Sequence, residues 1–147
     1  MPVAYVDLPS GLSASSKKKL VLELYAAIHH TYPIDDTRVL LREFSLEDVG
    51  QDGRLDAESM RPVVRLEVPP GVPLDAKRQL VGKISGALET ALRLRKDEVH
   101  LPSGKKVATN WVLTFFRESP LDQVALDGVM ASENPMVLEG MELARNR

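Results

Sequence analysis

The chain has 147 residues, of which 19 are lysine or arginine and 21 are aspartate or glutamate, and its formal net charge is −2. This near balance implies no polyanion or membrane surface as a partner, and scattered basic residues argue against nucleic acid. Without cysteine, disulfides and thiolate sites are excluded, and three histidines are a poor metal set. We expect one cytoplasmic domain without a membrane segment, metal or other cofactor.

The first predicted element is a strand over 3–8, and it opens a stretch that the chain repeats. Residues 2–12, PVAYVDLPSGL, align without a gap with residues 62–72, PVVRLEVPPGV, at an offset of 60. We expect the ungapped register to continue as far as Val39 over Val99 and Leu41 over Leu101. Two copies and no more indicate a duplicated unit rather than a solenoid.

Each copy continues with a turn and an amphipathic helix, and then with a second strand. The turns are Pro-Ser-Gly and Pro-Pro-Gly, and the apolar residues of both helices recur at the spacing of one helical stripe. The second strands are predicted at 37–44 and 111–116, the latter after an inserted hairpin tip, HLPSGKKVATN. The helical stripes comprise Leu20, Val21, Leu24, Ala27 and Ile28 in the first copy, and Leu80, Val81, Ile84, Ala87 and Leu88 in the second.

The pattern predicts an α/β (α+β) fold in which two tandem β-α-β units form a four-stranded sheet with two helices on one face. We expect one domain over 1–147, with units at 2–59 and 62–118 and a tail at 119–147. The strands are apolar nearly throughout, so the second sheet face needs cover, which an oligomer would supply. The tail should form a short helix from about Pro135 that packs against the body or a neighbour through Met136, Leu138, Met141 and Leu143.

Pro2 is the residue whose position suggests a catalytic role. If Met1 is removed, Pro2 carries the α-amine, whose pKa in model peptides is about 7.7–8.0. Burial and nearby cations lower the pKa of an amine, which would make Pro2 a general base near neutral pH. The equivalent Pro62 cannot act in this way, because its nitrogen is in an amide bond with Arg61.

Three segments carry a resemblance to a known family. MPVAYVDLPSGLS and TRVLLREFSLEDVGQDG resemble 4-oxalocrotonate tautomerase, and WVLTFFRESPLDQVALDG resembles the fused branch that includes cis-3-chloroacrylic acid dehalogenase. The chain is similar to the tautomerase superfamily over roughly residues 2–130. The resemblance implies a catalytic N-terminal proline, a homotrimer, a small carboxylate substrate, Arg38 as a carboxylate-binding residue and Val49 at an apolar position of the site.

The sequence also departs from these relatives. Leu12 stands where the short tautomerases have an arginine, and the turn Pro69-Pro70-Gly71-Val72 lacks the two arginines of the dehalogenase branch. Asp127 takes the place of the tyrosine that activates water in that branch. The sets of residues for dehalogenation and decarboxylation are therefore incomplete, whereas proton transfer by Pro2 remains available.

The further candidates each have a structural alternative. Arg38 and Arg42 share one strand face and would bind a carboxylate or form surface ion pairs with neighbouring acids. Arg117 is a second carboxylate contact, Trp111 lines the pocket or the core, and Arg65 marks an interface or site. His29 activates substrate or caps a solvated helix end.

The predicted function is therefore a tautomerase, an isomerase that uses Pro2 as general base and acid. It would move a proton between oxygen and carbon of a 2-hydroxydienoate or enolpyruvate-type acid. The alternatives are hydration, dehalogenation or decarboxylation of a small unsaturated or semialdehyde acid, and a trimeric binding protein without catalysis.

Overall fold

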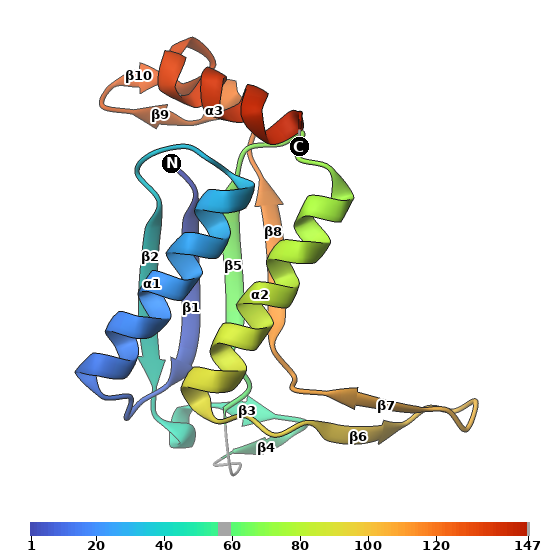
Figure 1. Ribbon diagram of the computed structural model, residues 1–147. Coiled ribbons are helices and arrows are strands. Elements are labelled where there is room, and N and C mark those ends of the chain that lie inside the picture. Colours follow the sequence, from blue (N-terminus) through green and yellow to red (C-terminus); the bar gives the residue numbers. More distant parts are fainter. Residues whose placement is uncertain (56–59, 147) are drawn as a thin grey trace.

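The computed structural model describes residues 1–55 and 60–146, and its centre is a four-stranded sheet (Figure 1). The strand order is β2-β1-β5-β8. β1 is parallel to β2, β5 is parallel to β8, and the central pair β1·β5 is antiparallel. The predicted pair of β-α-β units is confirmed. The strands are β1 (Val3–Pro9), β2 (Arg38–Phe44), β5 (Val63–Val68) and β8 (Leu113–Glu118).

Helices α1 (Ala14–Thr31) and α2 (Leu74–Leu92) lie on the same face of the sheet, as the sequence predicts (Figure 1). α1 begins after Ser13, whose hydroxyl accepts a hydrogen bond from the Ser16 N–H at 3.1 Å. The predicted stripes face the sheet, and the residues of the stripes that are buried are Leu20, Leu24, Ala27, Ile28, Leu80, Ile84, Ala87 and Leu88.

The two units repeat the same contacts, but the predicted register is wrong beyond the helices. Pro2 O accepts the Arg38 N–H at 2.9 Å, and Pro62 O accepts the Leu113 N–H at 3.1 Å. Arg38 thus corresponds to Leu113, an offset of 75, and not to a residue 60 positions later. Val99 and Leu101 lie in the inserted hairpin of β6 (Asp97–His100) and β7 (Lys106–Thr109), not in the main sheet.

Strand β8 begins two residues later than predicted because Trp111 has a φ of 63°, which is incompatible with a strand. Its counterpart at the offset of 75, Asp36, has a φ of 64°. The loop that enters the second strand therefore bends in the same way in both units.

The repeat extends into residues that the sequence assigns to the tail. η1 (Leu46–Asp48), β3 (Gly50–Gln51) and β4 (Arg54–Leu55) follow β2. At the offset of 75, η2 (Leu121–Gln123), β9 (Ala125–Leu126) and β10 (Val129–Met130) follow β8. The turn residues Asp52 and Asp127 both have positive φ, 50° and 53°.

After η3 (Ala131–Glu133), the tail forms the predicted helix, α3 (Pro135–Arg145), beyond the sheet end at which the chain starts (Figure 1). Met141 is buried and Met136 packs against the core, whereas Leu138 and Leu143 are 43% and 60% exposed, so for these two the predicted packing is not against the body of the same chain. A Cβ on Gly140 would lie 2.6 Å from the Pro33 carbonyl oxygen, so α3 sits very close to the loop that enters β2.

The sheet face opposite the helices carries charged residues as well as the apolar ones that we predict from the sequence. Alternation along the strands buries one side of β1 and β5 and leaves charged residues between apolar ones on the other. Leu40, Leu113 and Phe115 are 45%, 49% and 49% exposed on that face. Among the described residues, no helix is long and apolar enough to cross a bilayer.

Candidate active site at the start of the first strand

Pro2 is buried immediately before β1, and two hydrogen bonds tie the start of the chain to the loop between α1 and β2. The Met1 α-amine donates to the Asp35 carbonyl oxygen at 2.5 Å, and the Arg38 N–H donates to the Pro2 carbonyl oxygen at 2.9 Å. The parallel pairing of β1 and β2 thus places Arg38 beside the start of the chain.

The α-amine at this position has a lowered pKa. Burial lowers the pKa of the Met1 amine from 8.0 to about 6, because the charged form loses hydration. The charges of Asp36 and Asp35 oppose this shift, and that of Arg38 contributes to it. The Met1 amine is therefore largely neutral at pH 7 and can accept a proton.

Arg38 is engaged by a carboxylate from its own loop. Its Nε donates to Asp36 Oδ1 and its Nη2 to Asp36 Oδ2, both at 3.0 Å. This hydrogen bonding lowers the pKa of Asp36 and raises the pKa of Arg38. The surface ion pair that we gave as the structural alternative for Arg38 is therefore present. The Arg38 side chain is nevertheless 60% exposed, so its guanidinium is also accessible to a substrate.

Arg117 lies at the same end of the sheet as Arg38, on the other edge strand. The register connects Arg38 to Val3, Val3 to Glu67, and Glu67 to Arg117 in one row across the four strands. Arg117 Nη1 lies 3.6 Å from Glu67 Oε1. Both arginines are therefore placed near the proline end, and each has an acidic neighbour.

Arg42 is on the open sheet face but farther from Pro2 along β2. Its Nε and Nη2 donate to the two oxygens of Asp7 at 2.6 and 3.0 Å, and its guanidinium lies 5.5 Å from the centre of the Tyr5 ring. Arg65 also approaches Asp7, at 3.4 Å. A cavity of about 450 Å³ on this face is lined by Tyr5, Arg42, Arg65, Glu67, Phe115, Phe116 and Arg117.

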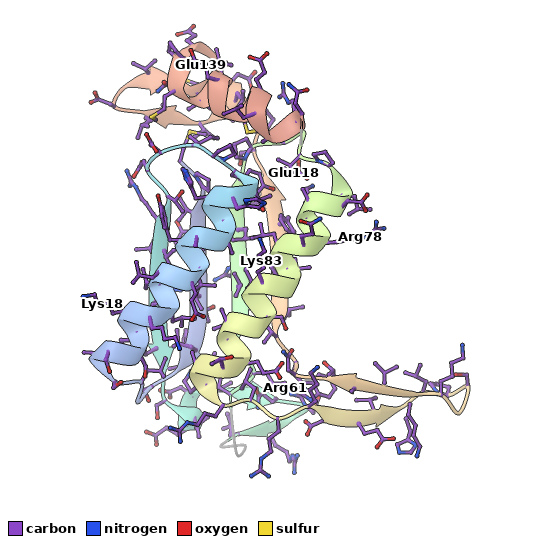
Figure 2. The ribbon with its side chains drawn as sticks, in the orientation of Figure 1. Lys18, Arg61, Arg78, Lys83, Glu118 and Glu139 are labelled. Carbon is purple, nitrogen blue, oxygen red and sulfur yellow. The ribbon has the colours of Figure 1, made fainter. Side chains whose placement is uncertain are left out.

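Val49 and Trp111 lie at the opposite end of the sheet from Pro2. Val49 follows η1, which comes after β2, and Trp111 precedes β8. Trp111 Nε1 donates to Asp97 Oδ2 at 2.7 Å, and the Arg61 guanidinium stacks 3.9 Å from the indole centre. Figure 2 shows Arg61 at this end, beside the hairpins. Arg61 is absent from the sequence prediction because its partner is distant in the chain.

His29 and Tyr32 lie near the end of α1. His29 is half-buried and stacked on Tyr25 at 5.4 Å between ring centres, and its Nδ1 has no hydrogen-bond partner among the described residues. The Tyr32 hydroxyl is also buried without a hydrogen-bond partner among the described residues. Burial raises the pKa of Tyr32, and the charge of Glu118 contributes to a smaller extent. The sequence prediction misses Tyr32, because only its tertiary burial distinguishes it.

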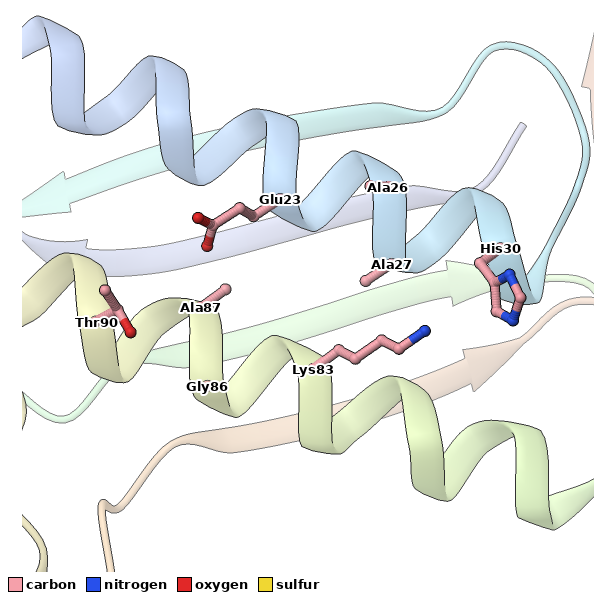
Figure 3. A pocket seen from close by; sticks show the side chains of 8 residues that line it. All are labelled: Glu23, Ala26, Ala27, His30, Lys83, Gly86, Ala87 and Thr90. Carbon is pink, nitrogen blue, oxygen red and sulfur yellow. The ribbon is translucent and has the colours of Figure 1, made fainter.

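A larger cavity, of about 560 Å³, lies between α1 and α2 and contains none of the predicted site residues. In Figure 3, Lys83 extends toward His30 from the facing helix, and Glu23 lies toward Thr90. The groove is otherwise lined by small residues, Ala26, Ala27, Gly86 and Ala87. Across residues 1–55 and 60–146, no three metal-binding side chains cluster.

Comparison with known proteins identifies the fold. No protein-family model matches the sequence, and no curated protein matches it significantly. The native structure of fused 4-OT has a TM-score of 0.72 and 21% identity, covering 88% of this chain and 96% of that chain. A symmetric trimer of wild-type fused 4-OT has a TM-score of 0.72 and 19% identity, covering 89% of this chain and 97% of that chain. Pt0534 inactivated by 2-oxo-3-pentynoate has a TM-score of 0.65 and 18% identity, covering 88% of this chain and 96% of that chain. The chain has the fused tautomerase-like fold.

Proposed function

We propose that the protein is a tautomerase in which removal of Met1 exposes Pro2 as the catalytic amine. The observation that supports this most directly is the desolvated α-amine at the start of β1, beside Arg38. The Pro2 nitrogen follows Met1 along the chain, and Pro2 is buried whereas Met1 is half-buried. Desolvation should therefore also lower the pKa of a Pro2 amine.

In the proposed reaction, the neutral Pro2 amine takes the proton from the 2-hydroxyl of an enol acid. The electron pair moves through the double bonds, and the resulting ammonium returns one proton to carbon, so the amine is regenerated. An arginine that holds the carboxylate orients the substrate and stabilises the negative charge that develops on it. Arg38 is best placed for this role, and Arg117 follows in the same row of the sheet.

We further propose a homotrimer, as in the fused 4-OT structures described as trimers. In such an assembly, the exposed apolar side chains on the open sheet face would be covered. Val49 and Trp111 lie at the far end of the same chain, so their role at a Pro2 site requires a neighbouring subunit. We also propose a cytoplasmic location, in line with the sequence-based expectation.

The test compares wild type, Pro2→Ala and Pro62→Ala by ultraviolet ketonisation of phenylenolpyruvate and 2-hydroxymuconate. Pro62 is the matched control because it is buried at the equivalent position with its nitrogen in an amide bond. We expect wild type and Pro62→Ala to be active and Pro2→Ala to lose most of the activity. Equal rates with Pro2→Ala, or an intact mass that retains Met1, would contradict the assignment and favour a binding protein.

One observation favours hydrolytic dehalogenation or decarboxylation as a second candidate. The sequence has no cation in the turn Pro69–Val72, but the Arg145 guanidinium from α3 reaches that turn, with Nε 3.0 Å from the position of a Cβ on Gly71. In the described part of the chain, Arg145 has no ion-pair partner. Chloride release from 3-chloroacrylate, or carbon dioxide from malonate semialdehyde, that is lost in Arg145→Gln would support this candidate.

A further inference from the structure

The arginines that are candidates for holding a substrate carboxylate each have an acidic neighbour in the free protein. Arg42 pairs with Asp7 and Arg117 with Glu67. Arg38, the arginine nearest the α-amine, has the most complete partner, because Asp36 fills two of its donors in the side-on geometry that a free carboxylate would adopt. Within residues 1–55 and 60–146, Arg38 Nη1 makes no hydrogen bond.

We propose that Asp36 competes with the substrate carboxylate for the Arg38 guanidinium and thereby sets the affinity of the site for carboxylates. This inference rests on the proposed function, because it concerns the same site. A substrate carboxylate must either displace Asp36 from Nε and Nη2 or bind Arg38 through its outer edge. The cost of displacing Asp36 lowers the affinity of every carboxylate by the same factor, so only anions with additional contacts in the pocket stay bound at low concentration.

The loop holds Asp36 in the competing position. Arg38, two residues after Asp36, is tied through its N–H to the Pro2 carbonyl oxygen at 2.9 Å, a bond that does not involve Met1. Asp36 has a φ of 64°, a conformation that aspartate tolerates better than most residues. The loop backbone thus keeps the Asp36 carboxylate close to Arg38, so little conformational entropy is lost when the two side chains pair.

The size of the effect is limited by exposure. The Arg38 and Asp36 side chains are 60% and 33% exposed, and exposed ion pairs contribute little. Removing the Asp36 charge should therefore strengthen carboxylate binding by up to about fivefold. A larger change is not expected, because water already screens the pair.

The test measures binding by NMR titration with crotonate, which carries a carboxylate, and with crotonamide, its uncharged analogue. We expect Asp36→Asn to tighten crotonate binding by up to about fivefold and to leave crotonamide binding unchanged. KM for phenylenolpyruvate should fall by a similar factor, with a smaller change in kcat. Asp35→Asn is the matched control, because Asp35 is the residue next to Asp36 and has the same charge, but in the described part of the chain it makes no ion pair with Arg38; its gain should be smaller.

The same comparison in an Arg38→Gln background separates direct competition for Arg38 from long-range electrostatic repulsion between Asp36 and the ligand carboxylate. There, Asp36→Asn should give no gain for crotonate. The proposal is overturned if Asp36→Asn weakens crotonate binding, because Asp36 would then position Arg38 rather than compete for it. It is also overturned if the gain persists without Arg38, or if neither wild type nor Asp36→Asn binds crotonate through Arg38.

Failure of this proposal is distinguishable from failure of the proposed function. Crotonate binding requires no turnover, so an Arg38-dependent gain in Asp36→Asn can be seen even if no enol acid is ketonised. Conversely, activity that depends on Pro2 without a gain in Asp36→Asn would retain the tautomerase and remove the competition.

Discussion

Tyr5 and Arg65 lie directly opposite each other in the central antiparallel strand pair, and they are equivalent residues of the two units. The approximate two-fold axis between the units therefore passes between them. The units differ where they meet: Arg65 reaches Asp7 at 3.4 Å, whereas Tyr5 lies beneath the Arg42 guanidinium. The duplication thus preserves the backbone pairing but not the chemistry on the open face.

The same symmetry relates two ion pairs, and we predict that they differ in strength. Lys17 contacts Glu43 at 2.9 Å, and Lys77 contacts Glu118, but the lysine side chains are 38% and 18% exposed. Lys77 also lies over the Phe116 ring. Lys77→Met should lower the free energy of unfolding by about 1–2 kcal/mol, and Lys17→Met by less than about 0.5 kcal/mol. Urea denaturation measures both, and equal losses would contradict the prediction.

The terminal amine predicts a pH dependence for protein that retains Met1. Its pKa falls from 8.0 to about 6 on folding, so the unfolded chain binds more protons between these values. Stability should therefore be greatest above pH 8 and fall as the pH is lowered through 8 to 6. Thermal melts from pH 5 to 9 test this, with N-terminally acetylated protein as the control. The same dependence in the acetylated protein would exclude the amine as its source.

Asp36→Asn should lower the pKa of the terminal amine further. The Asp36 charge raises this pKa and Arg38 lowers it, so removal of the carboxylate leaves the opposing cation. The pH dependence of amine modification by an acylating reagent at limiting concentration measures the shift. Arg38→Gln should move the pKa upward and provides the control of opposite sign. Shifts in the same direction would contradict this electrostatic account.

Glycine-to-alanine substitutions in two helices should have opposite effects. An added Cβ at Gly140 in α3 would lie 2.6 Å from the Pro33 carbonyl oxygen, whereas at Gly82 in α2 it meets nothing within 4 Å. Gly82→Ala should stabilise the protein by about 0.5–1 kcal/mol through helix propensity. Gly140→Ala should destabilise it by about 1–3 kcal/mol, because α3 must move away from the loop before β2. Stabilisation by both would show that α3 packs differently.

Gly71 and Gly11 provide a matched pair for the position of Arg145. Their φ angles are 102° and 110°, so alanine is strained at both, but only at Gly71 would a Cβ meet Arg145, at 3.0 Å from Nε. We expect similar losses of stability from the backbone strain. The Arg145 Nε–H NMR resonance should shift in Gly71→Ala alone. A shift in neither variant would place Arg145 away from the turn.

The amino-acid pattern alone predicts most of the elements, because helix and strand periodicity are local properties. The apolar stripes that contain Leu24 and Ile84, together with the leading Pro2 and Pro62, make the duplication visible in the residues themselves. The ungapped register fails after α2, because Val99 and Leu101 match Val39 and Leu41 in residue type but not in structural position. Sequence similarity cannot show that they belong to an inserted hairpin, whereas backbone pairing does.

The sequence by itself determines the two β-α-β units, the common helical face and the presence of a proline that can become a terminal amine. The tertiary structure decides what each arginine contacts: Arg38 pairs with Asp36, Arg61 stacks on Trp111, and Arg145 reaches the turn at Gly71. These contacts depend on strand register and on α3 crossing the sheet end. Burial of the Met1 amine, which lowers its pKa to about 6, also follows from packing between segments that are distant in the chain.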